Sequence, residues 1–224
     1  MKLGVLFTGG KDSCYALYKA REKHDVVCLI SIISENKESF MFHTPNIEIT
    51  DLQAKAIGLP LLKQVTKGEK EKELKDLEIA IENAVKKYKI EGIVTGAVES
   101  VYQATRVQKI CNKLGLGCFN PLWKRNQEEL LKEIVDEKFK VIISGVFAYP
   151  LDFQWLGKVI DKDMIERLID LSHGKYEISP TGEGGEYEST VLDAPFFKKE
   201  IEIIDFEIVD MIDSGVYNIK GGLK

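Results

Sequence analysis

Residues 2–13 read Lys-Leu-Gly-Val-Leu-Phe-Thr-Gly-Gly-Lys-Asp-Ser, and this stretch sets the expectation for the whole fold. Lys2 to Phe7 has the apolar composition of a short buried strand. Thr8 to Gly10 has the chemistry of a turn, and Ser13 to Lys23 suits a helix. The stretch therefore predicts a strand, a tight turn and a helix in immediate succession.

The predicted turn combines several groups that attract anions. Its two glycines can take positive φ and let backbone N–H groups converge, and a helix start adds free N–H groups and a positive dipole. Lys11 adds a full charge, whereas Asp12 suits a helix cap or a Mg²⁺ ligand. An ordinary capped turn is the alternative, and neither the Walker pattern nor the dinucleotide fingerprint is present. We expect the phosphates of a nucleotide to bind at Thr8, Gly9, Gly10, Lys11, Asp12 and Ser13.

Apolar runs alternate with helical patterns from residue 1 to about residue 120. Further strands are expected at Val26–Ile33, Leu61–Val65, Gly92–Thr95 and Leu116–Asn120, and helices at Glu48–Ile57, Glu69–Lys89 and Ser100–Leu114. This rhythm favours an α/β fold with a parallel five-stranded sheet flanked by helices. Such sheets bind ligands at the carboxyl ends of their strands, where His43 and the turn from Gly96 to Ser100 are also expected.

The rhythm changes after Pro121. A helix is expected at Gln127–Lys138 and another at Met164–Leu171, with strands at Val141–Val146, Ser189–Leu192 and Ile201–Val209. We therefore expect residues 1–120 to form a nucleotide-binding domain and residues 121–224 to form a smaller α+β domain.

Composition narrows the class of protein. The net charge of the 224 residues is −5, which argues against broad nucleic-acid binding, because phosphate neutralisation supplies most of that affinity. The four cysteines form no C-x-x-C pair, so zinc-site spacing is absent. No signal peptide or membrane-length apolar run is recognisable, and we expect a cytoplasmic protein that could be oligomeric.

The turn resembles the PP-loop signature S/T-G-G-x-D-S of the ATP-pyrophosphatase superfamily. That resemblance implies cleavage of ATP between the α and β phosphates and activation of a substrate oxygen as its adenylate. Further segments, in order, are similar to the diphthine–ammonia ligase family in its compact archaeal-type form: residues 39–46, 96–106, 121–123 and 182–188. The family resemblance implies that ATP and ammonium amidate diphthine on elongation factor 2, giving diphthamide, AMP and pyrophosphate.

This resemblance also implies roles for individual residues. Lys11, Mg²⁺ held by Asp12, and Arg106 would neutralise charge during adenylation, although Arg106 can equally be a surface residue of its helix. Glu183 and Glu186 would orient ammonium or accept its proton, the alternative being an exposed acidic turn. The remaining candidates are His43, Gly96 and Ser100 for ATP, and Tyr102, Gln103, Gly184, Gly185 and Tyr187 for the substrate.

Three other functions are compatible with parts of this pattern. A PP-loop enzyme that modifies tRNA would share the turn, but thiolating members typically need paired cysteines or zinc ribbons. A nucleotide-binding module without turnover would leave Lys11, Asp12 and residues 182–188 without a purpose. A self-contained amidotransferase would need a glutaminase part, which is not recognisable, so free ammonium is the expected nitrogen donor.

Overall fold

A computed structural model describes residues 1–35, 45–69, 72–211 and 214–224. Its first layer is a five-stranded sheet in the order β3 (Leu61–Thr66), β2 (Asp25–Ser34), β1 (Lys2–Leu6), β4 (Gly92–Val94) and β5 (Gly117–Phe119). Every neighbouring pair is parallel, as the alternating sequence pattern predicts. The predicted α/β fold is therefore confirmed.

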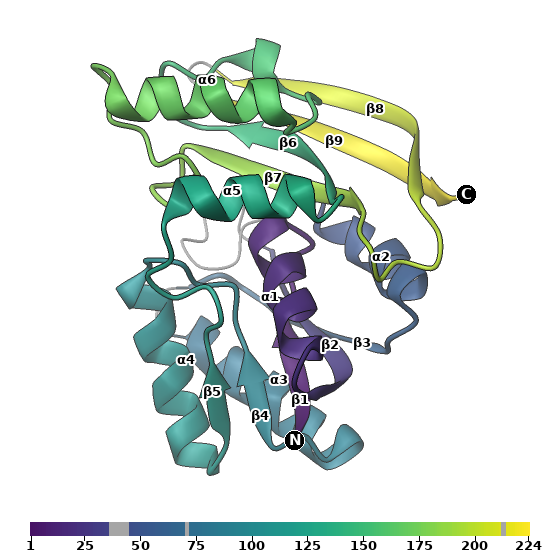
Figure 1. Cartoon of the computed structure of the whole chain (residues 1–224). Helices are drawn as coiled ribbons and strands as arrows, with labels where there is room; N and C mark the ends of the chain where they lie inside the picture. The colour runs from purple at the N-terminus through teal and green to yellow at the C-terminus, as the bar shows by residue number, and fades with distance from the viewer. Residues whose placement is uncertain (36–44, 70–71, 212–213) are drawn as a thin grey trace.

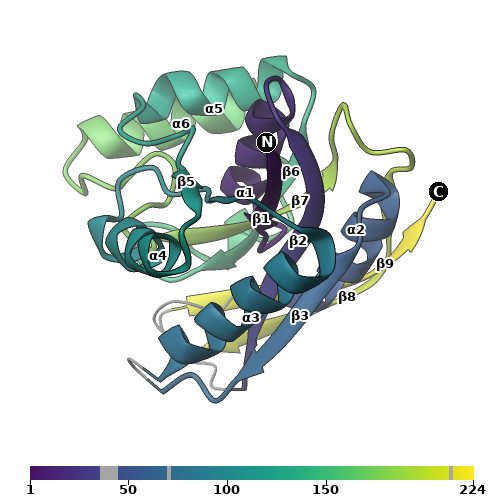
Figure 2. The same ribbon diagram turned by 90° about the horizontal axis from the view of Figure 1, so that it is seen from below.

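Helices cover both faces of this sheet (Figures 1 and 2). On one face, α3 (Glu73–Tyr88) and α4 (Val101–Leu114) bury an apolar cluster against β2 and β4. On the other face, α1 (Lys11–Arg21) packs against β1 and β4, and the short α2 (Thr50–Ile57) lies beside β3. Apolar residues at three- and four-residue spacing give each of the longer helices the stripe that it buries.

A second sheet is antiparallel, in the order β7 (Tyr187–Asp193), β6 (Lys140–Val146), β9 (Ser214–Leu223) and β8 (Ile201–Met211). The helices α5 (Gln127–Asp136) and α6 (Lys162–His173) pack together on it (Figure 1). The sequence pattern predicts β6, β7 and β8 but not β9, whose glycines and alternating polar residues give a weak strand signal.

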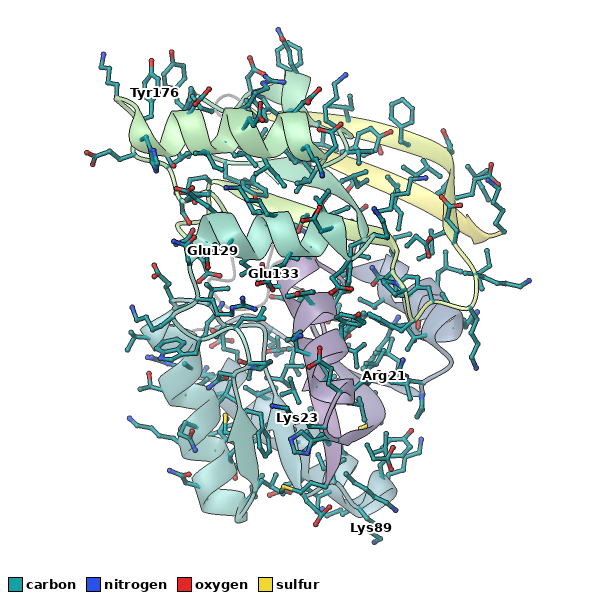
Figure 3. The ribbon with its side chains drawn as sticks, in the orientation of Figure 1. Arg21, Lys23, Lys89, Glu129, Glu133 and Tyr176 are labelled. Carbon is teal, nitrogen blue, oxygen red and sulfur yellow. The ribbon has the colours of Figure 1, made fainter. Side chains whose placement is uncertain are left out.

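The two sheets share one core. A single apolar cluster includes residues of β1 and α1 together with residues of α5, α6 and β6. Tyr15 of α1 donates a 2.8 Å hydrogen bond to Glu133 of α5, which lies toward α1 in Figure 3. The division at residue 120 stays a prediction, although each sheet is drawn from one side of it.

Short connections join the remaining elements. The 3-10 turns η1 (Ile47–Ile49) and η2 (Phe153–Trp155) precede α2 and follow β6. Within the described ranges, no helix combines the length and the apolar character needed to cross a bilayer.

Candidate functional site

A cavity of about 330 Å³ opens beyond the carboxyl ends of β1 and β4. The chain leaves β1 toward one side of the sheet and β4 toward the other, so the following loops diverge and leave a crevice there. Eleven residues predicted for the site line this cavity: Thr8, Lys11, Asp12, Ser13, Gly96, Ser100, Gln103, Glu183, Gly184, Gly185 and Tyr187. The cavity therefore unites the turn after β1 with the Gly-rich segment before β7.

The two glycines of the turn lie behind the cavity lining, where they pack against neighbouring elements. Gly9 has φ of +81°, and its carbonyl oxygen accepts hydrogen bonds from Gln53 Nε2 at 2.8 Å and from the Val191 N–H at 3.0 Å. A Cβ on Gly9 would lie 2.2 Å from Gln53 Oε1. Neither Gly9 nor Gly10 lines the cavity. Their predicted contact with phosphate stays a prediction, while their structural role is to bring β1, α2 and β7 together.

Helix α1 begins at Lys11, earlier than the predicted Ser13, because Gly10 is the last extended residue. Among the described residues, no acceptor bonds the N–H groups of Asp12 and Ser13. Thr8 Oγ1 and Ser13 Oγ lie 3.2 Å apart beside them. Free N–H groups, hydroxyls and the positive end of a helix dipole form an anion-binding site.

Gly96 fixes the opposite wall of this anion-binding end. A Cβ at Gly96 would lie 2.7 Å from the Asp12 carbonyl carbon and 2.8 Å from the Ser13 nitrogen. The loop after β4 therefore packs directly on the first peptide groups of α1, which only glycine allows. Ser100 caps α4 by accepting the Gln103 N–H, so its hydroxyl is already used at the helix start.

Lys11 is buried, with 3% of its side chain exposed. Its Nζ contacts Asp12 Oδ2 at 2.8 Å and the Thr181 carbonyl oxygen, and lies 5.2 Å from the Tyr187 ring centroid. Burial by itself lowers the pKa of Lys11, but Asp12 and then Tyr187 more than offset this, and the net pKa is raised. Lys11 therefore remains a fixed positive charge on the cavity wall.

Asp12 offers one oxygen for a cation. Its Oδ2 pairs with Lys11, whereas Oδ1 is buried and has no hydrogen-bond partner among the described residues. A buried carboxylate oxygen without a partner suits a hard divalent cation such as Mg²⁺. No group of three His, Cys, Asp or Glu side chains within the described ranges could hold a metal ion. A magnesium ion at Asp12 would therefore take its other ligands from phosphate and water, as Mg²⁺ commonly does.

The Gly-rich segment forms the carboxylate side of the cavity. Gly182 and Gly185 have φ of +76° and +83°, and the Gly185 N–H donates to the Gly182 carbonyl at 2.9 Å. Glu183 Oε2 accepts the Glu99 N–H at 3.0 Å, which draws the segment to the loop after β4. Burial and then Asp12 raise the pKa of Glu183. The predicted acidic turn thus folds inward rather than standing in solvent.

Glu186 does not line the cavity. Its Oε1 accepts the Ser179 N–H at 2.7 Å, so this carboxylate braces the base of the segment. The structure supplies another carboxylate that sequence reasoning left out of the site, Glu188 at the start of β7. Burial is the main cause that raises the pKa of Glu188 to about 7. The positive charge of Lys11 lowers this pKa in part, and the negative charges of Asp12 and Glu183 raise it. The signal that could have found it is the repeated Glu at 183, 186 and 188.

Gln127, the first residue of α5, was also missed. Its Oε1 accepts the Ser179 hydroxyl at 2.6 Å and the Thr181 hydroxyl at 2.7 Å, and its Nε2 donates to Glu99 at 3.2 Å. One amide therefore ties both walls of the carboxylate side together. No local sequence pattern marks it, because its partners lie 28 to 54 residues away.

The remaining predicted residues are Tyr102, Arg106 and His43. The Arg106 guanidinium lies 3.4 Å from the Tyr102 ring centroid, and neither residue lines the cavity. Tyr102 and Tyr187 thus each already face a cation of this chain, Arg106 and Lys11 respectively. His43 lies outside the described residues. The roles expected of these residues stay predictions.

Comparison with known proteins identifies the family to which the chain belongs. Residues 1–118 match the family model of the diphthamide synthase N-terminal domain, and residues 126–224 match that of the C-terminal domain. The chain belongs to the diphthamide synthase family. The resemblance drawn from the motifs is confirmed across both halves of the chain.

Curated diphthamide synthase relatives carry the name diphthine–ammonia ligase. The Homo sapiens protein is 36% identical over 229 residues, which cover 93% of this chain and 85% of that protein. The Schizosaccharomyces pombe protein is 35% identical over 237 residues, covering 98% of this chain and 39% of that longer protein. A solved structure from Methanocaldococcus jannaschii, described as a predicted subunit of tRNA methyltransferase, is 14% identical to this chain, with a TM-score of 0.43. The match covers 87% of this chain and 98% of that chain.

Chemically, this candidate site has two unlike ends. Free N–H groups and hydroxyls at the start of α1 attract anions, and Asp12, Glu183 and Glu188 attract cations. Lys11 lies between them, bonded to Asp12 and to Thr181. Such a site can hold a nucleotide phosphate and a small cation side by side, which an amide-forming ligase requires.

Proposed function

We propose that this chain catalyses the ATP-dependent amidation of diphthine on elongation factor 2. Ammonium supplies the nitrogen, an acyl-adenylate is the intermediate, and diphthamide, AMP and pyrophosphate are the products. Family membership supports this proposal, and the observation that carries it is the cavity in which an anion-binding helix start faces inward-folded carboxylates. A ligase that joins a carboxylate to ammonium through ATP needs both.

The residues of the cavity contribute to ATP binding and to adenylation. The β and γ phosphates of ATP bind at the N–H groups of Asp12 and Ser13, with Thr8 donating its hydroxyl. Lys11 offsets part of the charge that repels the diphthine carboxylate from the α phosphate. Asp12 would hold a magnesium ion, which would supply further positive charge there. Arg106 faces Tyr102 outside the cavity lining, so it would act on this step only through its charge at longer range.

The substrate enters the cavity at its mouth, which is formed by Gln103, Gly184 and Gly185. All three residues are exposed. The glycines carry no side chain, so a side chain of a protein substrate can approach the backbone closely. Glu183 lies behind them and holds positive charge near the reacting carboxylate. Elongation factor 2 would therefore present its modified residue as a protruding group.

The test is AMP formation from labelled ATP with Mg²⁺, ammonium and diphthine-bearing elongation factor 2. We expect AMP and pyrophosphate only when that protein and ammonium are both present at turnover conditions, with diphthamide detected by mass spectrometry. AMP formed only with tRNA would replace this proposal by a tRNA-modifying activity. ATP binding without turnover under any of these conditions would indicate a non-catalytic module.

Substitution of Lys11 tests the role of the turn. Lys11→Ala removes the fixed charge of the cavity wall, so we expect turnover to fall by more than about 100-fold. Folding should survive, because the Asp12 side chain left behind is 26% exposed and can be solvated. Circular dichroism checks the fold, and Lys199→Ala, an exposed lysine, is the matched control. Wild-type turnover in Lys11→Ala would show that the turn does not bind the reacting phosphates.

A further inference from the structure

We propose that Glu188 is the residue that binds the ammonium ion and accepts its first proton. This inference rests on the proposed function and assigns the nitrogen-handling step to one side chain. Glu188 is the second residue of β7, pairs in register with Gly145 of β6, and lines the same cavity as Lys11 and Glu183. It is the last residue of the motif at residues 182–188, but it is not among the site residues expected from that motif.

Ammonium must approach the cavity from the end away from the phosphates. The start of α1 carries unbonded N–H groups and the positive end of a helix dipole, so it repels a cation. Glu183, Tyr187 and Glu188 line the same cavity from the Gly-rich segment and the first two residues of β7. A small cation is therefore drawn to the carboxylate wall, beside the place where the acyl group forms.

Each of the other carboxylates near the cavity either has one bonded oxygen or lies outside the cavity lining. Asp12 Oδ2 pairs with Lys11 Nζ at 2.8 Å, and its Oδ1 is the oxygen suited to Mg²⁺. Glu183 Oε2 accepts the Glu99 N–H at 3.0 Å. Glu186 Oε1 accepts the Ser179 N–H at 2.7 Å, and although its Oε2 is buried without a partner among the described residues, Glu186 does not line the cavity. Within the described residues, neither oxygen of Glu188 makes a hydrogen bond or an ion pair. Glu188 is thus the carboxylate left available for a ligand.

The charges around Glu188 also suit a proton acceptor. The buried surroundings and the charges of Asp12 and Glu183 raise its pKa to about 7, while Lys11 lowers it. A carboxyl group that ionises near neutral pH can take up a proton there, which an ordinary carboxylate does poorly. This property supports the geometric argument and matches the step required.

Amide formation removes two protons from the ammonium nitrogen and exchanges one bond at the acyl carbon. Ammonium has no lone pair, so one proton passes from nitrogen to a Glu188 oxygen and leaves ammonia in the cavity. The ammonia nitrogen forms a bond to the acyl carbon, the bond from that carbon to the adenylate oxygen breaks, and AMP leaves with its electron pair. A second proton leaves the nitrogen for water, and the amide remains.

Hydroxylamine separates this step from adenylation, because it is largely neutral at neutral pH and attacks acyl-adenylates without first losing a proton. The experiment compares wild type with Glu188→Gln, using diphthine-bearing elongation factor 2, ATP and Mg²⁺. Diphthamide and the corresponding hydroxamate are measured by mass spectrometry. With limiting ammonium, we expect Glu188→Gln to form diphthamide about 100-fold more slowly, while hydroxamate forms at close to the wild-type rate.

Each other outcome overturns the inference. Loss of both products in Glu188→Gln would place Glu188 in adenylation or in binding the diphthine side chain. Wild-type rates of both products would show that another group handles ammonium. Absence of both products in the wild type would instead overturn the proposed function itself. Glu207→Gln, an exposed glutamate on β8, is the matched control, and Glu188→Asp, which keeps the carboxylate, should retain part of the ammonium-dependent rate.

Discussion

Glu188 shows how the fold sets the chemistry of a single residue. Its carboxyl group belongs to a strand end that closes over Lys11 and Asp12, where water is partly excluded. Burial and two like charges there disfavour its ionised form, which an exposed glutamate would keep at neutral pH. Because folding raises the pKa of this carboxyl group above its value in water, its ionised form lowers the stability of the protein. The same change makes the group a better proton acceptor.

Glu188→Gln should change how stability depends on pH. The folded-state pKa of about 7 lies above the ordinary value of 4.5, so between these values the folded protein binds more protons than the unfolded chain. Glu188 therefore lowers the free energy of unfolding progressively as pH rises through this window. We expect Glu188→Gln to be more stable than wild type by about 1–2 kcal/mol at pH ~8, with little difference below pH ~4.5, since solvent in the cavity screens part of the effect.

Urea denaturation at both pH values measures this difference. Asp193 is common to both proteins and cancels in the comparison, whereas Glu183 interacts with Glu188 and its titration contributes to the measured difference. An equal stability difference at both pH values would show that the Glu188 carboxyl is not perturbed by its surroundings.

At the scale of elements, the site depends on how closely the loop after β4 approaches the start of α1. Gly96 contacts the peptide between Asp12 and Ser13 through backbone atoms alone. This contact holds the first N–H groups of α1 at the edge of the cavity without covering them. The loop after β4 also carries Glu99, whose N–H binds Glu183, so one loop positions both ends of the site.

Gly96→Ala should separate these two elements. The added Cβ would lie 2.7 Å from a backbone atom of Asp12, and a backbone neighbour cannot rotate away as a side chain can. We expect ATP to bind at least about tenfold more weakly, because the N–H groups move relative to the phosphates. Isothermal titration with ATP measures the affinity.

Gly222→Ala is the control, because its added Cβ would meet the flexible end of the Ile204 side chain far from the site. Unchanged ATP affinity in Gly96→Ala would show that the phosphates bind away from the start of α1.

At the scale of the molecule, the site lies on a seam between two sheets. The Lys11 N–H donates to the Ser189 hydroxyl at 3.2 Å, and the Val191 N–H donates to the Gly9 carbonyl at 3.0 Å. Gln53 of α2, fully buried, donates from Nε2 to the Gly9 and Val191 carbonyls at 2.8 Å each. Because the seam consists of buried hydrogen bonds above a shared apolar core, we expect both sheets to unfold as one unit.

Gln53→Ala tests this cooperation. It removes both hydrogen bonds and leaves a cavity where the sheets meet, so we expect the free energy of unfolding to fall by about 2–4 kcal/mol. Urea denaturation followed by fluorescence and circular dichroism should still show one coincident transition. Gln154→Ala, an exposed glutamine, should leave the midpoint unchanged. Two separate transitions in the wild type would show that the halves fold independently.

The sequence by itself determined the five parallel strands, the turn from Thr8 to Ser13, and the family, because each is encoded by local periodicity or by contiguous motifs. It also marked residues 182–188 as functional but did not single out Glu188 or Gln127, and the role that it suggested for Arg106 stays a prediction. Only the tertiary structure decided that β7 closes on the start of α1. Lys11 and Ser189 are 178 residues apart, and their contact depends on how the second sheet packs on the shared core, which no local pattern encodes.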